Sequence, residues 1–130
     1  MLEVSGLATA LAELGGVRVT GPLGYLDMLA LLERAQVVLT DSGGVQEETT
    51  YFGVPCLTLR DATERPATVT DGTNQVIGAR PDRVLAEIDR ILDGDRPAPR
   101  RPPLWDGHAA ERIAEVLARF AAERARAVTR

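Results

Sequence analysis

Apolar positions along the chain follow two spacings, one typical of strands and one typical of helices. Short apolar runs rich in β-branched residues predict buried strands. Longer segments with apolar residues three and four positions apart predict helices. The predicted strands cover residues 17–20, 36–40, 55–59 and 75–78. The predicted helices cover residues 4–14, 25–34, 44–52 and 82–92, with a longer one from about residue 108.

The order in which these elements follow one another predicts an α/β fold. Nearly continuous apolar strands that are separated by helices are typical of a parallel sheet covered on both faces. We therefore expect a Rossmann-like parallel sheet of about four strands, joined by right-handed crossovers. This domain is expected over residues 1–94, a proline-rich linker over 95–106, and an amphipathic helix over 107–130.

Composition removes several classes of chemistry. All 15 basic residues are arginine, which excludes a Schiff-base lysine, a pyridoxal-phosphate anchor and a Walker A loop. One cysteine (Cys56) and one histidine (His108) are too few for a Cys- or His-rich metal site. The net charge of −4 argues against non-specific electrostatic binding to nucleic acid. No apolar run is long enough for a membrane span. We therefore expect no metal, cofactor, nucleic-acid partner or membrane partner. Because a single cysteine cannot form an internal disulfide, we also expect a cytoplasmic protein.

The loop after the second predicted strand carries the richest candidate chemistry. Ser42, Gly43 and Gly44 begin a helix there, and the free N–H groups of a helix start, with the positive end of its dipole, bind phosphates well. The alternative is a plain strand-to-helix turn in which Ser42 or Asp41 caps the helix.

Two adjacent carboxylates follow this loop on the predicted helix. Helical side chains lean toward the N-terminus, so Glu48 overhangs the end formed by Gly44. A carboxylate in that place can accept hydrogen bonds from the two hydroxyls of a ribose. Glu47 points about a quarter-turn away, and we interpret it as an acid favoured by the helix dipole; the same interpretation is open for Glu48.

Two further loops lie at the same predicted edge of the sheet, where ligands of open parallel sheets bind. Arg65 is held extended by the following proline and could clamp a diphosphate, or form a surface pair with Glu64 or Asp61. Gly24 and Tyr25 could form a slot for a flat base, although a simple turn with a tyrosine in the core would give the same pattern. We interpret His108 as a helix-start residue, with a catalytic role as the lesser alternative. We interpret Cys56 as a buried apolar residue.

Several segments in a fixed order resemble the non-hydrolysing UDP-N-acetylglucosamine 2-epimerase family. The resemblance runs from about residue 17 to residue 78 and resumes weakly at residues 106–107 and 112–113. The combination of D-S-G-G-V-Q-E-E with T-E-R-P at this spacing is specific, whereas each piece alone would not be. The matching segments are residues 21–23, 25–27, 40–48, 53–55, 60–66 and 72–73.

This resemblance implies the GT-B architecture, in which two Rossmann-like domains hold a nucleotide sugar in the cleft between them, and this chain would form part of the C-terminal domain. Family members hold UDP with residues that correspond to Ser42, Glu48 and Arg65. The family reaction eliminates UDP to leave a 2-acetamidoglucal and then adds UDP back with C2 inverted. UDP-N-acetylglucosamine and UDP-N-acetylmannosamine are thereby interconverted.

The chain also departs from the family pattern. The acid–base carboxylates of the family lie in the N-terminal domain and a histidine lies early in the C-terminal domain. His108 does not occupy that position, and Trp105 stands where the family has a tyrosine. We therefore expect no catalytic residue in this chain, and no activity from it alone.

Other functions remain open from the sequence. The chain could be a non-catalytic module that binds UDP or a nucleotide sugar, or a piece of a GT-B glycosyltransferase, although T-E-R-P favours the epimerase family. Expected partners are UDP or a UDP-N-acetylhexosamine, together with a second copy of the chain or a chain that carries the missing domain. Apolar surface left uncovered on a partial domain predicts a homo-oligomer.

Overall fold

The computed structural model describes residues 6–128, which fall into two compact units divided between Leu31 and Leu32. The first unit contains α1 (Leu7–Glu13), and α2 (Tyr25–Arg34) spans the division. The predicted helix over residues 4–14 is α1, and its first residues lie outside the described part of the chain. The predicted helix over residues 25–34 is confirmed.

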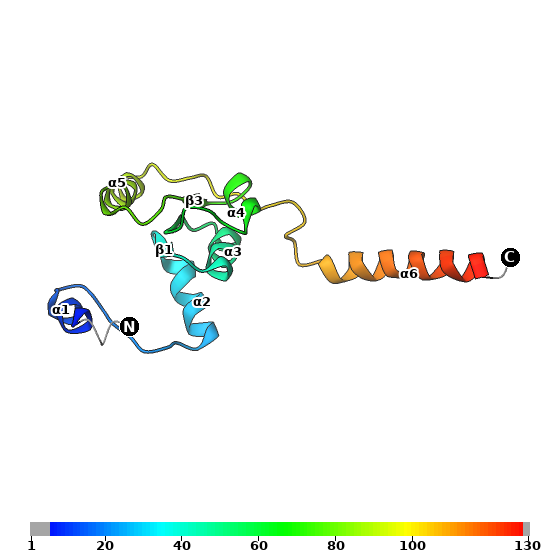
Figure 1. Ribbon diagram of the computed structural model, residues 1–130, viewed down its shortest axis with the longest axis horizontal. Helices are drawn as coiled ribbons and strands as arrows, with labels where there is room; N and C mark the ends of the chain where they lie inside the picture. Colours follow the sequence, from blue (N-terminus) through cyan, green and yellow to red (C-terminus); the bar gives the residue numbers. More distant parts are fainter. Residues whose placement is uncertain (1–5, 129–130) are drawn as a thin grey trace. The chain divides into compact units, whose positions relative to one another are not determined.

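The second unit holds the sheet and the remaining helices (Figure 1). Its strands are all parallel and lie in the order β1-β2-β3, with Leu39 beside Leu57 and Leu57 beside Gln75. In chain order, the elements of this unit are β1 (Val38–Thr40), α3 (Gly43–Phe52), β2 (Cys56–Thr58), α4 (Pro66–Thr70), β3 (Asn74–Val76), α5 (Pro81–Leu92) and α6 (Ala109–Val128).

Alternation along β2 directs side chains to both faces of the sheet. Leu57 packs with Ile77 and with Ile91 of α5, and these three buried residues form the apolar core. Cys56 and Thr58 point the other way, because side chains alternate along a strand, and Cys56 lies beside Thr49 of α3. Helices α5 and α3 therefore cover opposite faces (Figure 1), which confirms the predicted α/β fold.

The predicted strand over residues 17–20 is wrong. These residues belong to neither a strand nor a helix, and Val17 and Val19 are 44% and 47% exposed. A strand of this length is stable only when a neighbour pairs with it and buries one face. The sheet accordingly has three strands rather than about four.

The short helix α4 was not predicted. Pro66 occupies its first position, where the fixed φ of proline suits a helix start and its missing N–H costs nothing. Three of its five residues are β-branched, so helix propensity alone is weak. Residues 95–106 contain no helix or strand, and no described helix is both long and apolar enough to cross a membrane.

Candidate functional site

The turn between β1 and α3 presents unbonded donors at the carboxyl edge of the sheet. The backbone N–H of Ser42 donates to Thr40 Oγ1 at 3.0 Å. The Ser42 hydroxyl makes no capping hydrogen bond with the helix. Within the described part of the chain, the backbone N–H groups of Gly43, Gly44 and Val45 have no recorded partner. The turn therefore has the donors expected of an anion site, and the hydroxyl is free for a ligand.

Arg65 lies directly over this turn. A Cβ placed on Gly43 would be 3.7 Å from both Cγ and Nε of Arg65, so the arginine side chain passes over the glycine about one methyl group away. The sequence-predicted residues Ser42, Gly43, Gly44 and Arg65 are thus brought together by the β1–α3 turn and the loop before α4. A side-chain methyl at position 43 would fit beneath the arginine in ordinary van der Waals contact, so the position of Arg65 does not itself require a glycine there.

Glu47 holds the same arginine. Its Oε1 lies 3.0 Å from Arg65 Nε, an ion pair that lacks the alignment of a hydrogen bond. Glu47, interpreted from the sequence as an acid favoured by the helix dipole, therefore has a partner that its local sequence did not reveal. Gly43 and Glu47 are one helical turn apart on one face, and that spacing is the signal that could have revealed the pair once Arg65 was placed over Gly43.

Glu48 is half-buried beside this arrangement. No hydrogen bond or ion pair of its carboxylate is recorded among the described residues, whereas its neighbour Glu47 is paired with Arg65. Its carboxylate therefore keeps its capacity to accept hydrogen bonds from a ligand. The predicted role of Glu48 toward a ribose stays a prediction.

Gly24 and Tyr25 belong to the first unit. The Tyr25 side chain is 65% exposed, so it is not a core tyrosine. A Cβ on Gly24 would lie 3.2 Å from Asp27 Oδ2, so the Asp27 carboxylate lies back over Gly24 at the start of α2. The base slot proposed for these two residues stays a prediction.

Cys56 and His108, which were also interpreted from the sequence, make contacts within the protein that fit a structural role. Burial raises the pKa of the Cys56 thiol above its ordinary value, although hydrogen bonds with Thr49 and Thr58 oppose that shift. The His108 backbone N–H donates to Asp106 Oδ1 at 3.0 Å, just before α6. Arg112 lowers the pKa of the Asp106 carboxyl by hydrogen bonding to it. Within residues 6–128 there is no group of three or more His, Cys, Asp or Glu side chains that could hold a metal.

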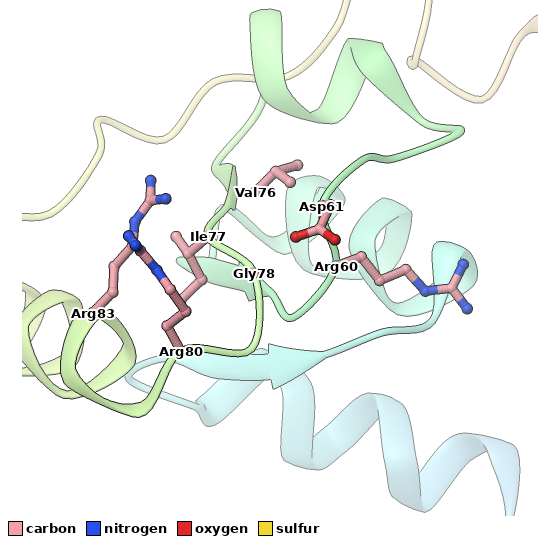
Figure 2. A pocket seen from close by; sticks show the side chains of 7 residues that line it. All are labelled: Arg60, Asp61, Val76, Ile77, Gly78, Arg80 and Arg83. Atoms are coloured by element: carbon pink, nitrogen blue, oxygen red, sulfur yellow. The ribbon is translucent and has the colours of Figure 1, made fainter.

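A separate pocket of about 410 Å³ opens at the carboxyl ends of β2 and β3 (Figure 2). Asp61 points into it and lies 3.4 Å from the position of a Cβ on Gly78. Figure 2 shows the Arg60 side chain extending away from Arg80 and Arg83. None of the residues predicted to bind the ligand lines this pocket, although Arg60 and Asp61 belong to the matching segment over residues 60–66.

Comparison with known proteins gives a consistent picture. The sequence model of a family described as UDP-N-acetylglucosamine 2-epimerase matches residues 3–118. The UDP-N-acetylglucosamine 2-epimerase of Methanocaldococcus jannaschii is 41% identical over 101 residues, which are 78% of this chain and 27% of that protein. The UDP-2,3-diacetamido-2,3-dideoxy-D-glucuronate 2-epimerase of Pseudomonas aeruginosa is 46% identical over 104 residues, 80% of this chain and 29% of that protein.

Solved structures agree with the sequences. The crystal structure of the Methanocaldococcus jannaschii UDP-GlcNAc 2-epimerase in complex with UDP-GlcNAc and UDP superimposes with a TM-score of 0.75 and 38% identity, covering 90% of this chain and 32% of that one. The chain thus spans less than a third of the length of these relatives.

Proposed function

This chain belongs to the UDP-N-acetylglucosamine 2-epimerase family, and we propose that its β1–α3 turn binds the UDP part of a UDP-N-acetylhexosamine. The observation that carries the proposal is the position of Arg65 across Gly43, over a helix start where the N–H groups of Gly43, Gly44 and Val45 have no partner among the described residues. A diphosphate is the ligand that such a combination of amides and a guanidinium suits.

Each predicted residue has a definite part in this proposal. Ser42, Gly43 and Gly44 donate to the diphosphate from the helix start. Arg65 faces Glu47 with Nε and donates from Nη1 to Glu64 O at 3.3 Å, while no bond of Nη2 is recorded among the described residues. Nη2 is therefore the donor that a phosphate oxygen would meet.

The remaining parts of the nucleotide are assigned from the sequence. The free Glu48 carboxylate would accept hydrogen bonds from the ribose hydroxyls. Gly24 and Tyr25 would form the slot for the uracil base. The domain over residues 1–94, the linker over 95–106 and the helix over 107–130 also stand as proposals.

The sugar is the less defined part of the ligand. One relative named above is a UDP-N-acetylglucosamine 2-epimerase and another is named for a diacetamido-glucuronate, and UDP is common to both names. We propose that the whole protein interconverts UDP-N-acetylglucosamine and UDP-N-acetylmannosamine. Family membership argues against a glycosyltransferase, and a non-catalytic UDP-binding module is the alternative.

We also propose where the protein is located in the cell and how it assembles. We propose a cytoplasmic protein, and the single cysteine, free and buried, is compatible with that location. We also propose self-association, because the apolar stripe of α6 is exposed and uncovered apolar surface favours contact between copies. A chain carrying the rest of a GT-B fold is the other proposed partner.

Calorimetric titration with UDP tests the proposal. Glu48→Ala should weaken UDP binding by about 1.5–3 kcal/mol, because a charged acceptor is lost, whereas Ser42→Ala should cost about 0.5–1.5 kcal/mol, because a neutral hydroxyl is lost. Uridine, which lacks the diphosphate, is the matched ligand control and should bind more weakly than UDP. We also expect no formation of UDP-N-acetylmannosamine by this chain alone, because no paired acid and base meet at the turn.

Two results would contradict this proposal. The first is the absence of UDP binding by the unaltered chain. The second is equal affinity for UDP and uridine, since a site built on helix-start amides and a guanidinium must recognise the diphosphate.

A further inference from the structure

A set of buried polar side chains lies next to Arg65, and the assignments above do not use it. Gln46 of α3 is 2% exposed and Asn74 of β3 is 3% exposed. Thr58 of β2 and Thr68 of α4 are fully buried. Burying such groups costs free energy unless hydrogen bonds replace those made with water. Because apolar side chains would fill the same space without this cost, the polar side chains at these positions call for a further explanation.

Gln46 and Asn74 form the centre of this set. Gln46 Oε1 accepts a hydrogen bond from Asn74 Nδ2 at 3.2 Å. Asn74 Oδ1 accepts one from Thr58 Oγ1 at 2.7 Å. The amide pair thereby joins α3 to β2 and β3, so that the start of α3 is tied to the sheet by side chains as well as by packing.

Two hydroxyls connect this pair to Arg65. Thr63 Oγ1 donates to Gln46 Oε1 at 2.6 Å and accepts from the Arg65 backbone N–H at 3.0 Å. Thr68 Oγ1 accepts from Asn74 Nδ2 at 2.9 Å and donates to the Arg65 carbonyl at 2.7 Å. Each hydroxyl donates its one proton and accepts another, so the bond directions are mutually consistent.

Both backbone polar groups of Arg65 are therefore held, and both connections lead to the buried amide pair. Gln46 lies on the same helix whose first turn carries Gly43. The unbonded amides of the turn and the arginine above them thus share one rigid support. A support of this kind lowers the entropy lost when a ligand binds, because the donors are already in place.

We propose that Gln46 and Asn74, acting through the hydroxyls of Thr63 and Thr68, are positioning residues that hold Arg65 over the start of α3 for an anionic ligand. The ligand part of this inference rests on the proposed function, in which Arg65 binds the diphosphate of UDP. The holding of the Arg65 backbone does not depend on it. Glu47 completes the arrangement by directing the far end of the arginine side chain.

The test compares Thr63→Val with Thr63→Ser in the full chain. Valine keeps the shape of threonine but has no hydroxyl, and serine keeps the hydroxyl. Thr70→Val is the matched control, because Thr70 is an exposed α4 threonine whose hydroxyl bonds to Pro66 O and Asp71 Oδ2, outside the set around Arg65. Two quantities are measured: hydrogen exchange of the Arg65 amide by NMR without ligand, and affinity for UDP by calorimetry.

Thr63→Val should speed exchange of the Arg65 amide and weaken UDP binding, each by roughly three- to tenfold, as expected for a lost neutral hydrogen bond. Thr63→Ser and Thr70→Val should both behave like the unaltered chain. Thr63→Ala, which also lacks the hydroxyl, gives the same comparison should the valine variant not fold.

The two proposals fail in different ways. Unchanged exchange of the Arg65 amide in the variants without the hydroxyl would overturn the inference. Faster exchange with unchanged UDP affinity would also overturn it, since the network would then support the fold without positioning Arg65 for a ligand. Absence of UDP binding by the unaltered chain would contradict the proposed function alone, because the exchange measurement needs no ligand and still decides whether the network holds Arg65.

Discussion

Helices α3 and α6 of the second unit differ in what they bury. The buried residues of α3 are polar, namely Gln46, Thr49 and Thr50. Helix α6 has an apolar stripe along one side, and each of its members is more than half exposed. These members are Ile113, Val116, Leu117 and Phe120.

The comparison shows that an apolar stripe and a buried face are different properties. A stripe predicts where a helix could bury surface, but burial needs a neighbour at that place. A polar face can be buried without a stripe when most of its groups find hydrogen-bond partners. Thr49 illustrates this, because its hydroxyl bonds to the carbonyls of Val45 and Gln46 within its own helix. The Gln46 side chain is also bonded, whereas the buried Thr50 hydroxyl has no partner among the described residues.

Close packing beside α3 gives the largest predicted effect. A Cβ on Gly72 would lie 2.4 Å from the carbonyl oxygen of Thr68 and 2.6 Å from Thr50 Cγ2, so backbone must move. Gly72→Ala should lower the free energy of unfolding by about 3 kcal/mol. Urea unfolding followed by circular dichroism measures this change. Gly21→Ala is the control, because a Cβ there meets nothing within 4 Å, and equal midpoints for the two variants would contradict the prediction.

The buried amide of α3 gives the next effect. Gln46→Leu should lower the free energy of unfolding by about 1–3 kcal/mol, because Asn74 and Thr63 lose an acceptor in a buried place. Gln36→Leu is the same substitution at an exposed residue, and it should change stability by less than about 0.5 kcal/mol. A leucine at position 46 that left the unfolding midpoint unchanged would show that α3 is held by shape alone.

The α6 stripe gives the smallest effect on stability and a clear effect on assembly. Leu117→Glu with Phe120→Glu should change the free energy of unfolding by no more than about 0.5 kcal/mol, because both side chains are exposed. The unaltered chain should form a homodimer or a larger oligomer by light scattering at micromolar concentration, equally in low and high salt, and the double variant should be monomeric.

The control for this change is Ala122→Glu, which adds a charge to α6 on another side of the helix. It should leave the oligomer intact. An unaltered chain that scatters as a 14.0 kDa monomer in both salts would show that the exposed stripe does not hold copies together.

Local patterns in the sequence determined most of the helices and the parallel strands. The stripe that predicted residues 82–92 is the face of α5 that packs on the sheet through Val84, Ile88 and Ile91. Gly43 and Gly44 after an apolar strand marked the start of α3. Such features depend on a few neighbouring residues, and resemblance to a family added the candidate roles of Ser42, Glu48 and Arg65.

Only the tertiary structure decided the features that depend on residues far apart in the chain. The segment at residues 17–20 has residues typical of a strand, but no strand in the described part of the chain pairs with it. Helix α6 has the apolar spacing of a helix that packs on a core, yet its stripe is exposed. Conversely, the Glu47–Arg65 ion pair and the bonds between Gln46, Asn74, Thr63 and Thr68 join separate elements. Hydrogen bonds and ion pairs act over a few ångströms, so they form only where the fold brings their partners together. The spacing of neighbouring residues in the sequence does not predict which distant residues will meet.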